Sequence, residues 1–182
     1  MWYFVYWLEN NTILLIRPLT QILMKTLQID NQKFDFVYSE SAKCYMSTQY
    51  VNDIEVSFEI YEDEYNQSQI DWDLFVDFVK NIKHKNSLPV LLSKSKKVLL
   101  ALAEAFGSSI NQDEKIEDYH MVFSSLQFKG SVKNNFSDGY YNFSLWFNIE
   151  NKNNANQYVD PYGAFITDVE GSFIVGAKRI QC

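Results

Sequence analysis

A regular alternation of apolar residues near the C-terminus constrains the fold most. Its apolar members are Tyr141, Phe143, Leu145, Phe147 and Ile149. Successive side chains of a strand point to opposite faces of a sheet, so this spacing predicts a long strand with one face in a hydrophobic core. Two shorter alternating runs follow, at residues 164–169 and 173–178, with Glu170 and Gly171 between them. They predict a β-hairpin with one packed face, on which Phe173, Val175 and Ala177 lie together.

Turn residues mark the ends of this hairpin. Pro161 fixes φ near the value for the second position of a turn, and Gly163 tolerates positive φ. Asp160-Pro161-Tyr162-Gly163 therefore predicts a tight turn before the first hairpin strand. Gly176 lies inside the second strand, where glycine is typical of a bulge or of a close approach by another backbone.

Strands are also predicted before and between these elements. Residues 24–29 predict a first strand, Asp30-Asn31 a turn, and the run through Phe34, Phe36 and Tyr38 a second strand. Alternation predicts two further strands. Their alternating residues are Ile54, Val56, Phe58 and Ile60 in one, and Val122, Ser124, Leu126 and Phe128 in the other.

Two segments carry helical spacing instead. In residues 72–85, Phe75, Phe78, Val79 and Ile82 recur on one face, Asp71 is placed to cap the first turn, and Ile70 to staple against Phe75. Residues 89–106 predict a second helix, opened by Ser87 and closed by Gly107. The apolar stripe of this second helix is predicted to be Leu91, Val98, Leu99, Leu102 and Phe106.

The order of strands, two helices and further strands predicts an α+β fold, an antiparallel sheet with two helices packed on one face. At 182 residues and 47% hydrophobic content, the chain is long enough to bury one core. We interpret residues 24–182 as a single domain. Residues 1–23 are a doubtful N-terminal extension, interpreted as a mis-assigned start; an interfacial anchor or a genuine extra strand are the alternatives. Glu9, Asn10, Asn11 and Arg17 interrupt the apolar run there, so no membrane span is expected.

Charge and residue types exclude several functions. The formal net charge of −7 disfavours nucleic acid as a partner, because phosphate binding depends on Lys and Arg, and it favours a basic protein partner. Cys44 and Cys182 lack metal-site spacing. His120 has Glu117 and Asp118 nearby, but a histidine among solvated acids explains that grouping. We therefore expect no metal, no cofactor and no catalytic site.

Acidic and aromatic residues are the candidate partner-binding groups. The acidic residues are Glu59, Glu62, Asp63 and Glu64, with Asp113, Glu114, Glu117 and Asp118 in a later loop. They could mimic the phosphates that a cationic nuclease toxin binds and so steer its association; simple solubility is the alternative. Trp146 and Tyr162 are candidate aromatic anchors on the outer side of the sheet, unless Trp146 lies beneath the helices.

The C-terminal motifs also resemble a family. They are Tyr-x-Phe-x-Leu-x-Phe from Tyr141, Asp-x-Tyr-Gly from Asp160 and Ile-Val-Gly-x-x-Arg from Ile174. Together they resemble uncharacterised small bacterial immunity-type proteins associated with polymorphic toxin systems, over about residues 140–181. Lys178-Arg179 stands where that family commonly has two arginines. The resemblance implies a toxin-neutralising role and carries over no catalytic residue.

Two hypotheses follow. The first is a cytoplasmic, non-catalytic interaction protein that binds and neutralises a toxin. The alternative is a small-ligand or carbohydrate-binding module, suggested by the 12 Tyr and 4 Trp residues. A deep, aromatic-lined cleft with no flat acidic face would favour the alternative.

Overall fold

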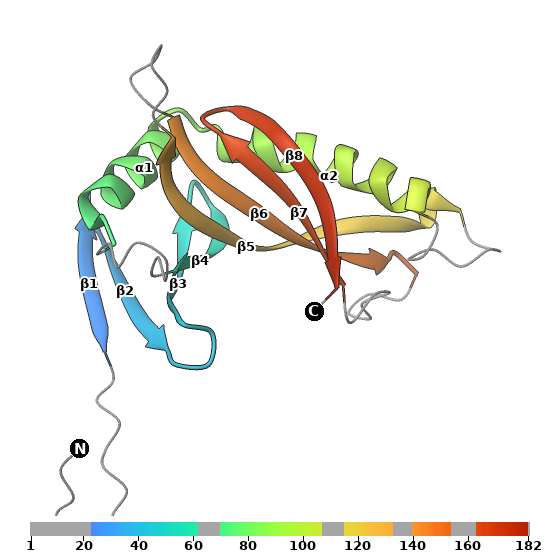
Figure 1. Ribbon diagram of the computed structural model, residues 1–182. Helices are drawn as coiled ribbons and strands as arrows, with labels where there is room; N and C mark the ends of the chain where they lie inside the picture. Colours follow the sequence, from blue (N-terminus) through green and yellow to red (C-terminus); the bar gives the residue numbers. More distant parts are fainter. Residues whose placement is uncertain (1–22, 62–69, 107–114, 133–139, 154–162, 182) are drawn as a thin grey trace, which may run out of the picture.

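The computed structural model describes residues 23–61, 70–106, 115–132, 140–153 and 163–181. Its elements are, in chain order, β1 (Met24–Ile29), β2 (Gln32–Ser39), β3 (Cys44–Val51), β4 (Ile54–Tyr61), α1 (Trp72–His84), α2 (Leu88–Phe106), η1 (Ile116–Asp118), β5 (Tyr119–Val132), β6 (Tyr140–Asn151), β7 (Gly163–Glu170) and β8 (Phe173–Gln181). This is the predicted α+β fold, with both helices on one face of a curved sheet (Figure 1).

The eight described strands lie in the sheet in sequence order. All neighbouring pairs are antiparallel except β4 and β5, which are parallel. A parallel pair needs a crossover connection, and the segment containing α1 and α2 supplies it. The sheet is therefore two four-stranded meanders joined at one parallel seam.

Local backbone chemistry explains the first meander. Asp30 takes a positive φ of 52°, which confirms the turn predicted between the first two strands. Asn52 and Asp53 take φ of 47° and 64° and form the two-residue loop from β3 to β4, a position where Asn and Asp are favoured. The predicted strands before and after this region are confirmed, whereas β3 has no counterpart in the sequence prediction.

Helix α1 forms as predicted. The Asp71 carboxylate accepts a hydrogen bond from the backbone N–H of Leu74 at 2.9 Å, which satisfies a free donor of the first turn. The four predicted core residues of this helix are buried against the sheet. They are Phe75, Phe78, Val79 and Ile82.

Helix α2 also forms, but its predicted stripe is wrong at Val98, which is exposed. The buried side chains are Leu88, Leu91, Leu92, Ser95, Leu99 and Ala103. They follow a spacing of three to four residues, and Val98 points about 100° away from Leu99. The sequence prediction missed Ser95 as a core position because serine is polar. Its hydroxyl is satisfied by the Thr167 hydroxyl of β7 at 2.8 Å.

Two of the three register shifts in the described second meander overturn parts of the predicted alternation. In β5, Phe123 lies opposite Phe147 and Ser125 opposite Trp146, so Ser124 is an extra residue. The faces exchange there. Before the bulge Met121 is buried and Val122 is only half-buried, whereas after it Leu126 is buried. The predicted single face through Val122, Ser124, Leu126 and Phe128 is therefore wrong in its first half.

In β8, Val169 lies opposite Ile174 and Asp168 opposite Gly176, so Val175 is the extra residue. Ile174 and Ala177 pack against the core, while Phe173 and Val175 are exposed, contrary to the predicted packed face. The bulge predicted at Gly176 is confirmed at the adjoining residue. The predicted turn at residues 160–163 lies outside the described residues, except that Gly163 begins β7.

Candidate functional site

One face of the sheet carries no described helix, and we call it the distal face. The rings of Phe36, Phe128 and Phe143 contact α1, so the residues that alternate with them point to the distal face. Strand register aligns these distal residues across the molecule. Within the described part of the chain, no helix is both long and apolar enough to cross a membrane.

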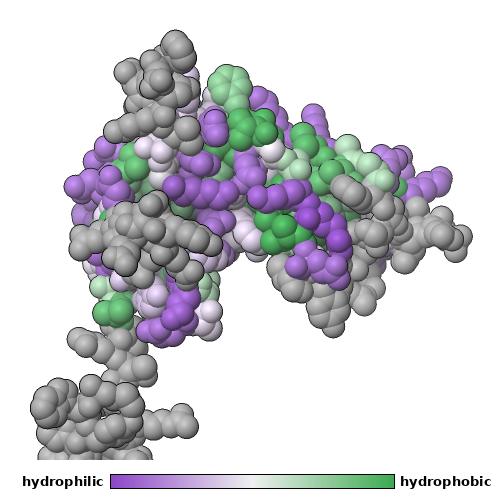
Figure 2. All heavy atoms as spheres, viewed as in Figure 1, coloured by the Kyte–Doolittle hydropathy of each residue, from purple (hydrophilic) through white to green (hydrophobic). Residues whose placement is uncertain are grey.

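Exposed apolar side chains line up on the distal face of the first meander. Met24 lies opposite Val37, and Val37 lies opposite Met46. These side chains are 59%, 44% and 41% exposed, which is high for apolar residues at aligned positions of neighbouring strands. Glu59 follows opposite Met46, and exposed Tyr61 lies two residues further along β4. We call Met24, Val37, Met46, Glu59 and Tyr61 the distal patch. Figure 2 shows hydrophobic residues at the surface where β1 begins and where β8 begins.

Glu59, one of the predicted partner-binding residues, is thus on a partly apolar surface. Its carboxylate accepts a hydrogen bond from the Tyr61 hydroxyl at 3.1 Å. Burial, followed by the charge of Glu59, raises the pKa of Tyr61, so the phenol stays protonated. Beside them, burial raises the pKa of the Cys44 thiol, which lies fully inside the protein. A protonated, inaccessible thiol is a poor nucleophile, so Cys44 adds packing to this region and no reactivity.

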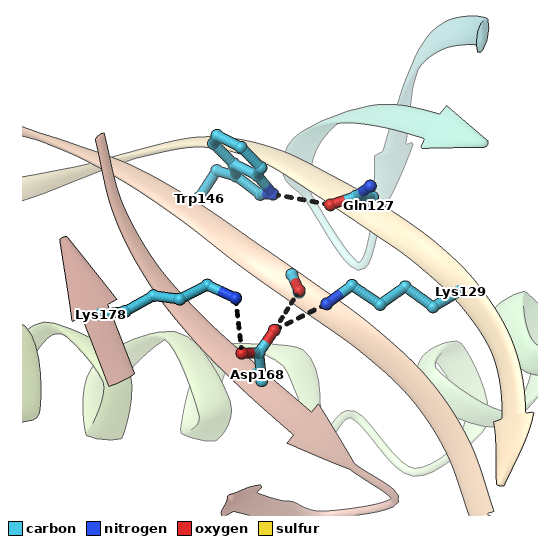
Figure 3. A network of polar contacts seen from close by, with 6 residues as sticks. Gln127, Lys129, Trp146, Asp168 and Lys178 are labelled. Atoms are coloured by element: carbon cyan, nitrogen blue, oxygen red, sulfur yellow. Dashed lines mark hydrogen bonds and ion pairs between the residues drawn. The ribbon is translucent and has the colours of Figure 1, made fainter. Parts of the chain in front are cut away.

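Trp146, the predicted aromatic anchor, lies on the distal face and is half-buried. Its indole N–H donates to the side-chain oxygen of Gln127 at 3.3 Å (Figure 3). Gln127 is also the register neighbour of Glu59 across the parallel seam. The structure therefore places Glu59 and Trp146 on one surface, with Gln127 between them.

A carboxylate at the centre of the second meander was missed by the sequence analysis. Asp168 of β7 accepts hydrogen bonds from Lys129 of β5 at 2.7 Å, Ser144 of β6 at 2.6 Å and Lys178 of β8 at 3.1 Å (Figure 3). One residue from each of four strands thus meets at this carboxyl group, which we call the Asp168 cluster. Burial disfavours the charged form, but the hydrogen bonds from Lys129, Ser144 and Lys178 outweigh burial and lower the pKa of Asp168 to about 2.

The Asp168 cluster predicts a dependence of stability on acid. Because the pKa of Asp168 is lower in the folded state than its ordinary value of 3.8, its contribution is present above about pH 4 and is lost as the pH falls toward about 2. We expect this contribution to be about 1–2 kcal/mol, allowing for the partial exposure of the lysines. Urea unfolding of wild type and Asp168→Asn at about pH 5 and about pH 2.5 measures it.

The asparagine variant should lose less stability on acidification than wild type, because its side chain does not titrate. Asp53→Asn is the matched control, since Asp53 is an exposed aspartate in the β3–β4 loop. Equal acid sensitivity of wild type and Asp168→Asn would show that the cluster does not couple protonation to folding.

The described acidic candidates lie far apart along the strand direction of the sheet. Glu117 and Asp118 form η1, where the carboxylate of Asp118 accepts from the backbone N–H of Lys115 at 3.3 Å. Glu59 is level with Gln127, nine residues along β5 from Asp118. At about 3.3 Å per residue, the two groups are separated by roughly 30 Å. The structure does not bring Glu59 and this pair into one acidic surface.

The remaining candidates lie outside the described residues. They are Glu62, Asp63, Glu64, Asp113, Glu114 and Tyr162. The His120 ring nitrogen Nε2 is 3.7 Å from the Glu150 carboxylate. Among the described side chains, no group of three or more His, Cys, Asp or Glu is arranged to hold a metal ion.

A scan against protein-family models, a search of curated proteins and a search of solved structures each found no match to this chain.

Proposed function

We propose that this chain is a non-catalytic interaction protein of the bacterial cytoplasm that binds a basic protein through its distal patch, in the manner of an immunity protein that neutralises a toxin. The observation that carries the proposal is the alignment of exposed Met24, Val37 and Met46 across three strands, next to Glu59. Burying these side chains against a partner removes apolar area from water, which is the main driving force of association.

Residue types and charge support the same proposal. Methionine and tyrosine are enriched in protein interfaces, and Tyr61 adds a ring with a polar tip to the distal patch. The net charge of −7 attracts a cationic partner over distances longer than a contact. The C-terminal resemblance to immunity-type proteins agrees with this assignment. We therefore expect the apolar residues to govern dissociation and the charge to govern association.

The interface is tested with Val37→Lys/Met46→Lys. Both side chains are exposed, so the core is left intact and folding should survive. The two lysines would lie opposite each other, and their repulsion should cost up to about 1 kcal/mol of stability, which urea unfolding of the double variant measures. The binding partner to be tested is the protein encoded by the gene next to the one for this chain. We expect its binding to weaken by about tenfold or more, mainly through faster dissociation, because charge replaces apolar contact. Glu59→Lys should instead slow association, most strongly at low salt. Binding kinetics at two ionic strengths, with both proteins purified after co-expression, measure these effects.

Val90→Lys is the matched control, because Val90 is an exposed valine on α2, away from the distal face. If the double variant binds as tightly as this control, the distal patch is not the interface. A neighbouring gene that encodes no toxin would remove the immunity-like role and leave the interface to be tested with another partner.

A further inference from the structure

A cavity of about 450 Å³ lies on the opposite side of the sheet from the distal patch. It opens between α1 and the end of the second meander where β6 begins and the β7–β8 turn closes, at the upper end of the sheet in Figure 1. Its lining residues are Leu74, Phe78, Asn81, Ile82, Lys85, Ser87, Ser131, Tyr140, Tyr141, Gly171 and Ser172. This volume is within the range of small-molecule sites.

Aromatic rings form the inner wall of this cavity. Phe78 is fully buried, stacks on Phe128 with ring centres 4.9 Å apart, and lies 5.4 Å from the Tyr141 ring. Burial, followed by the charge of Asp77, raises the pKa of Tyr141, so its hydroxyl is a neutral group that donates a hydrogen bond. A wall of packed rings with a phenol accommodates a flat, apolar ring.

Polar groups form the rim. The polar residues that line the cavity are Asn81, Lys85, Ser87 and Ser131, whose side chains carry an amide, an ammonium group and two hydroxyls. Within the described ranges, no carboxylate lines the cavity. Lys85 is the one charged side chain among the described lining residues, and Asp77, whose charge reaches Tyr141, does not line the cavity. An ammonium group favours an anion, and a neighbouring amide supplies a second donor to it. The rim therefore selects a negatively charged group on a ligand whose ring enters the aromatic part.

The wall formed by the β7–β8 turn is held against β6 by backbone contacts. The backbone N–H of Gly171 donates to the Tyr141 carbonyl at 2.8 Å, which fixes the β7–β8 turn against β6. Gly171 has a φ of 62°, and a Cβ there would stand 2.9 Å from the Tyr140 ring. Glycine is needed at this turn for both reasons. A preformed site loses less binding energy to ordering, which makes small ligands feasible.

We infer that this cavity binds a small aromatic acid, a single planar ring that carries one carboxylate. The ring lies against the half-buried ring of Tyr141, which Phe78 supports from the core side, and the carboxylate faces Lys85 and Asn81. This site is separate from the distal patch, so its ligand and the protein partner are bound by different surfaces.

Benzoate and benzamide are matched probes for this inference, because they share the ring and differ in charge. We expect benzoate to shift the backbone amide signals of Asn81, Lys85 and Gly171 saturably in nitrogen-15 NMR spectra of the full chain, and benzamide to bind about fivefold more weakly. Lys85→Met should reduce benzoate affinity to the level of benzamide and leave benzamide affinity unchanged. Lys80→Met is the control, since Lys80 is an exposed lysine of α1 that does not line the cavity.

Three outcomes would overturn the inference. They are an absence of saturable shifts at the lining residues, equal affinity for the two probes, and an equal loss of benzoate affinity in Lys80→Met and Lys85→Met. An equal loss in the two lysine variants would show that benzoate affinity depends on the net charge of the protein and not on a contact with Lys85. Because the lysine variants leave the distal patch intact, binding of the protein partner tests the proposed function independently.

Discussion

Replacing Phe75 with alanine is expected to lower the free energy of unfolding by about 3–5 kcal/mol, the range for removing a buried phenylalanine ring. The ring of Phe75 is fully buried at the meeting point of α1 and both meanders. Its neighbours are the rings of Phe36 at 5.3 Å, Phe58 at 5.4 Å, Phe128 at 5.4 Å, Phe78 at 6.2 Å and Trp72 at 6.4 Å between centroids. Five rings cannot close over the space without moving strands, so a cavity remains. Urea unfolding followed by circular dichroism measures the loss.

Phe173→Ala is the matched control, because Phe173 is 67% exposed on β8. We expect that change to cost less than about 0.5 kcal/mol. If Phe75→Ala destabilised the protein no more than this control, the aromatic cluster would not be what joins the helix to the two meanders.

The second large effect is expected at the hydroxyl pair between α2 and β7. Ser95 and Thr167 are fully buried, and their hydroxyl oxygens, Oγ and Oγ1, lie 2.8 Å apart. Thr167→Val keeps the shape of the side chain but leaves the Ser95 hydroxyl without its partner, at an expected cost of about 1–3 kcal/mol. Rotation of the serine hydroxyl toward the carbonyl four residues earlier would reduce this cost. Thermal and urea unfolding of the variant provide the measurement.

Ser95→Ala/Thr167→Val is expected to be closer to wild type than Thr167→Val alone, because no buried polar group is then left without a partner. Additive losses in the double variant would show that the two hydroxyls do not depend on each other.

The elements that could be predicted from sequence are those whose determinants are local. Asp71 and the apolar stripe of α1 lie within a few turns of each other, and the β7–β8 turn is set by Gly171. β3 could not be predicted, because the run from Cys44 to Val51 mixes Ser, Thr and Gln with apolar residues. It is a strand because β2 and β4 pair with it. The bulge at Ser124, where the two faces of β5 exchange, could not be predicted either, because it is defined by the pairing of β5 with β6.

The candidate site was predictable only in part. Glu59 could be singled out as an acidic residue and Trp146 as an aromatic one, but their common surface depends on the parallel seam between β4 and β5. No sequence signal specifies that seam, because it joins residues nearly 70 positions apart. The Asp168 cluster is the extreme case, since each member is an ordinary polar residue of its own strand.

The Asp168 cluster also distinguishes between strand registers that bury the same apolar side chains. Sliding one strand past its neighbour by a single position would expose its apolar side chains, so burial alone prevents that error. Sliding it by two positions returns every apolar side chain to the core face and costs burial little. Such a slip in β5, β6 or β8 would carry a lysine or the serine about 7 Å from the Asp168 carboxylate and remove one of the three donors to a partly buried charge. The four polar residues therefore select one register of the neighbouring strands among those that burial of the apolar side chains permits.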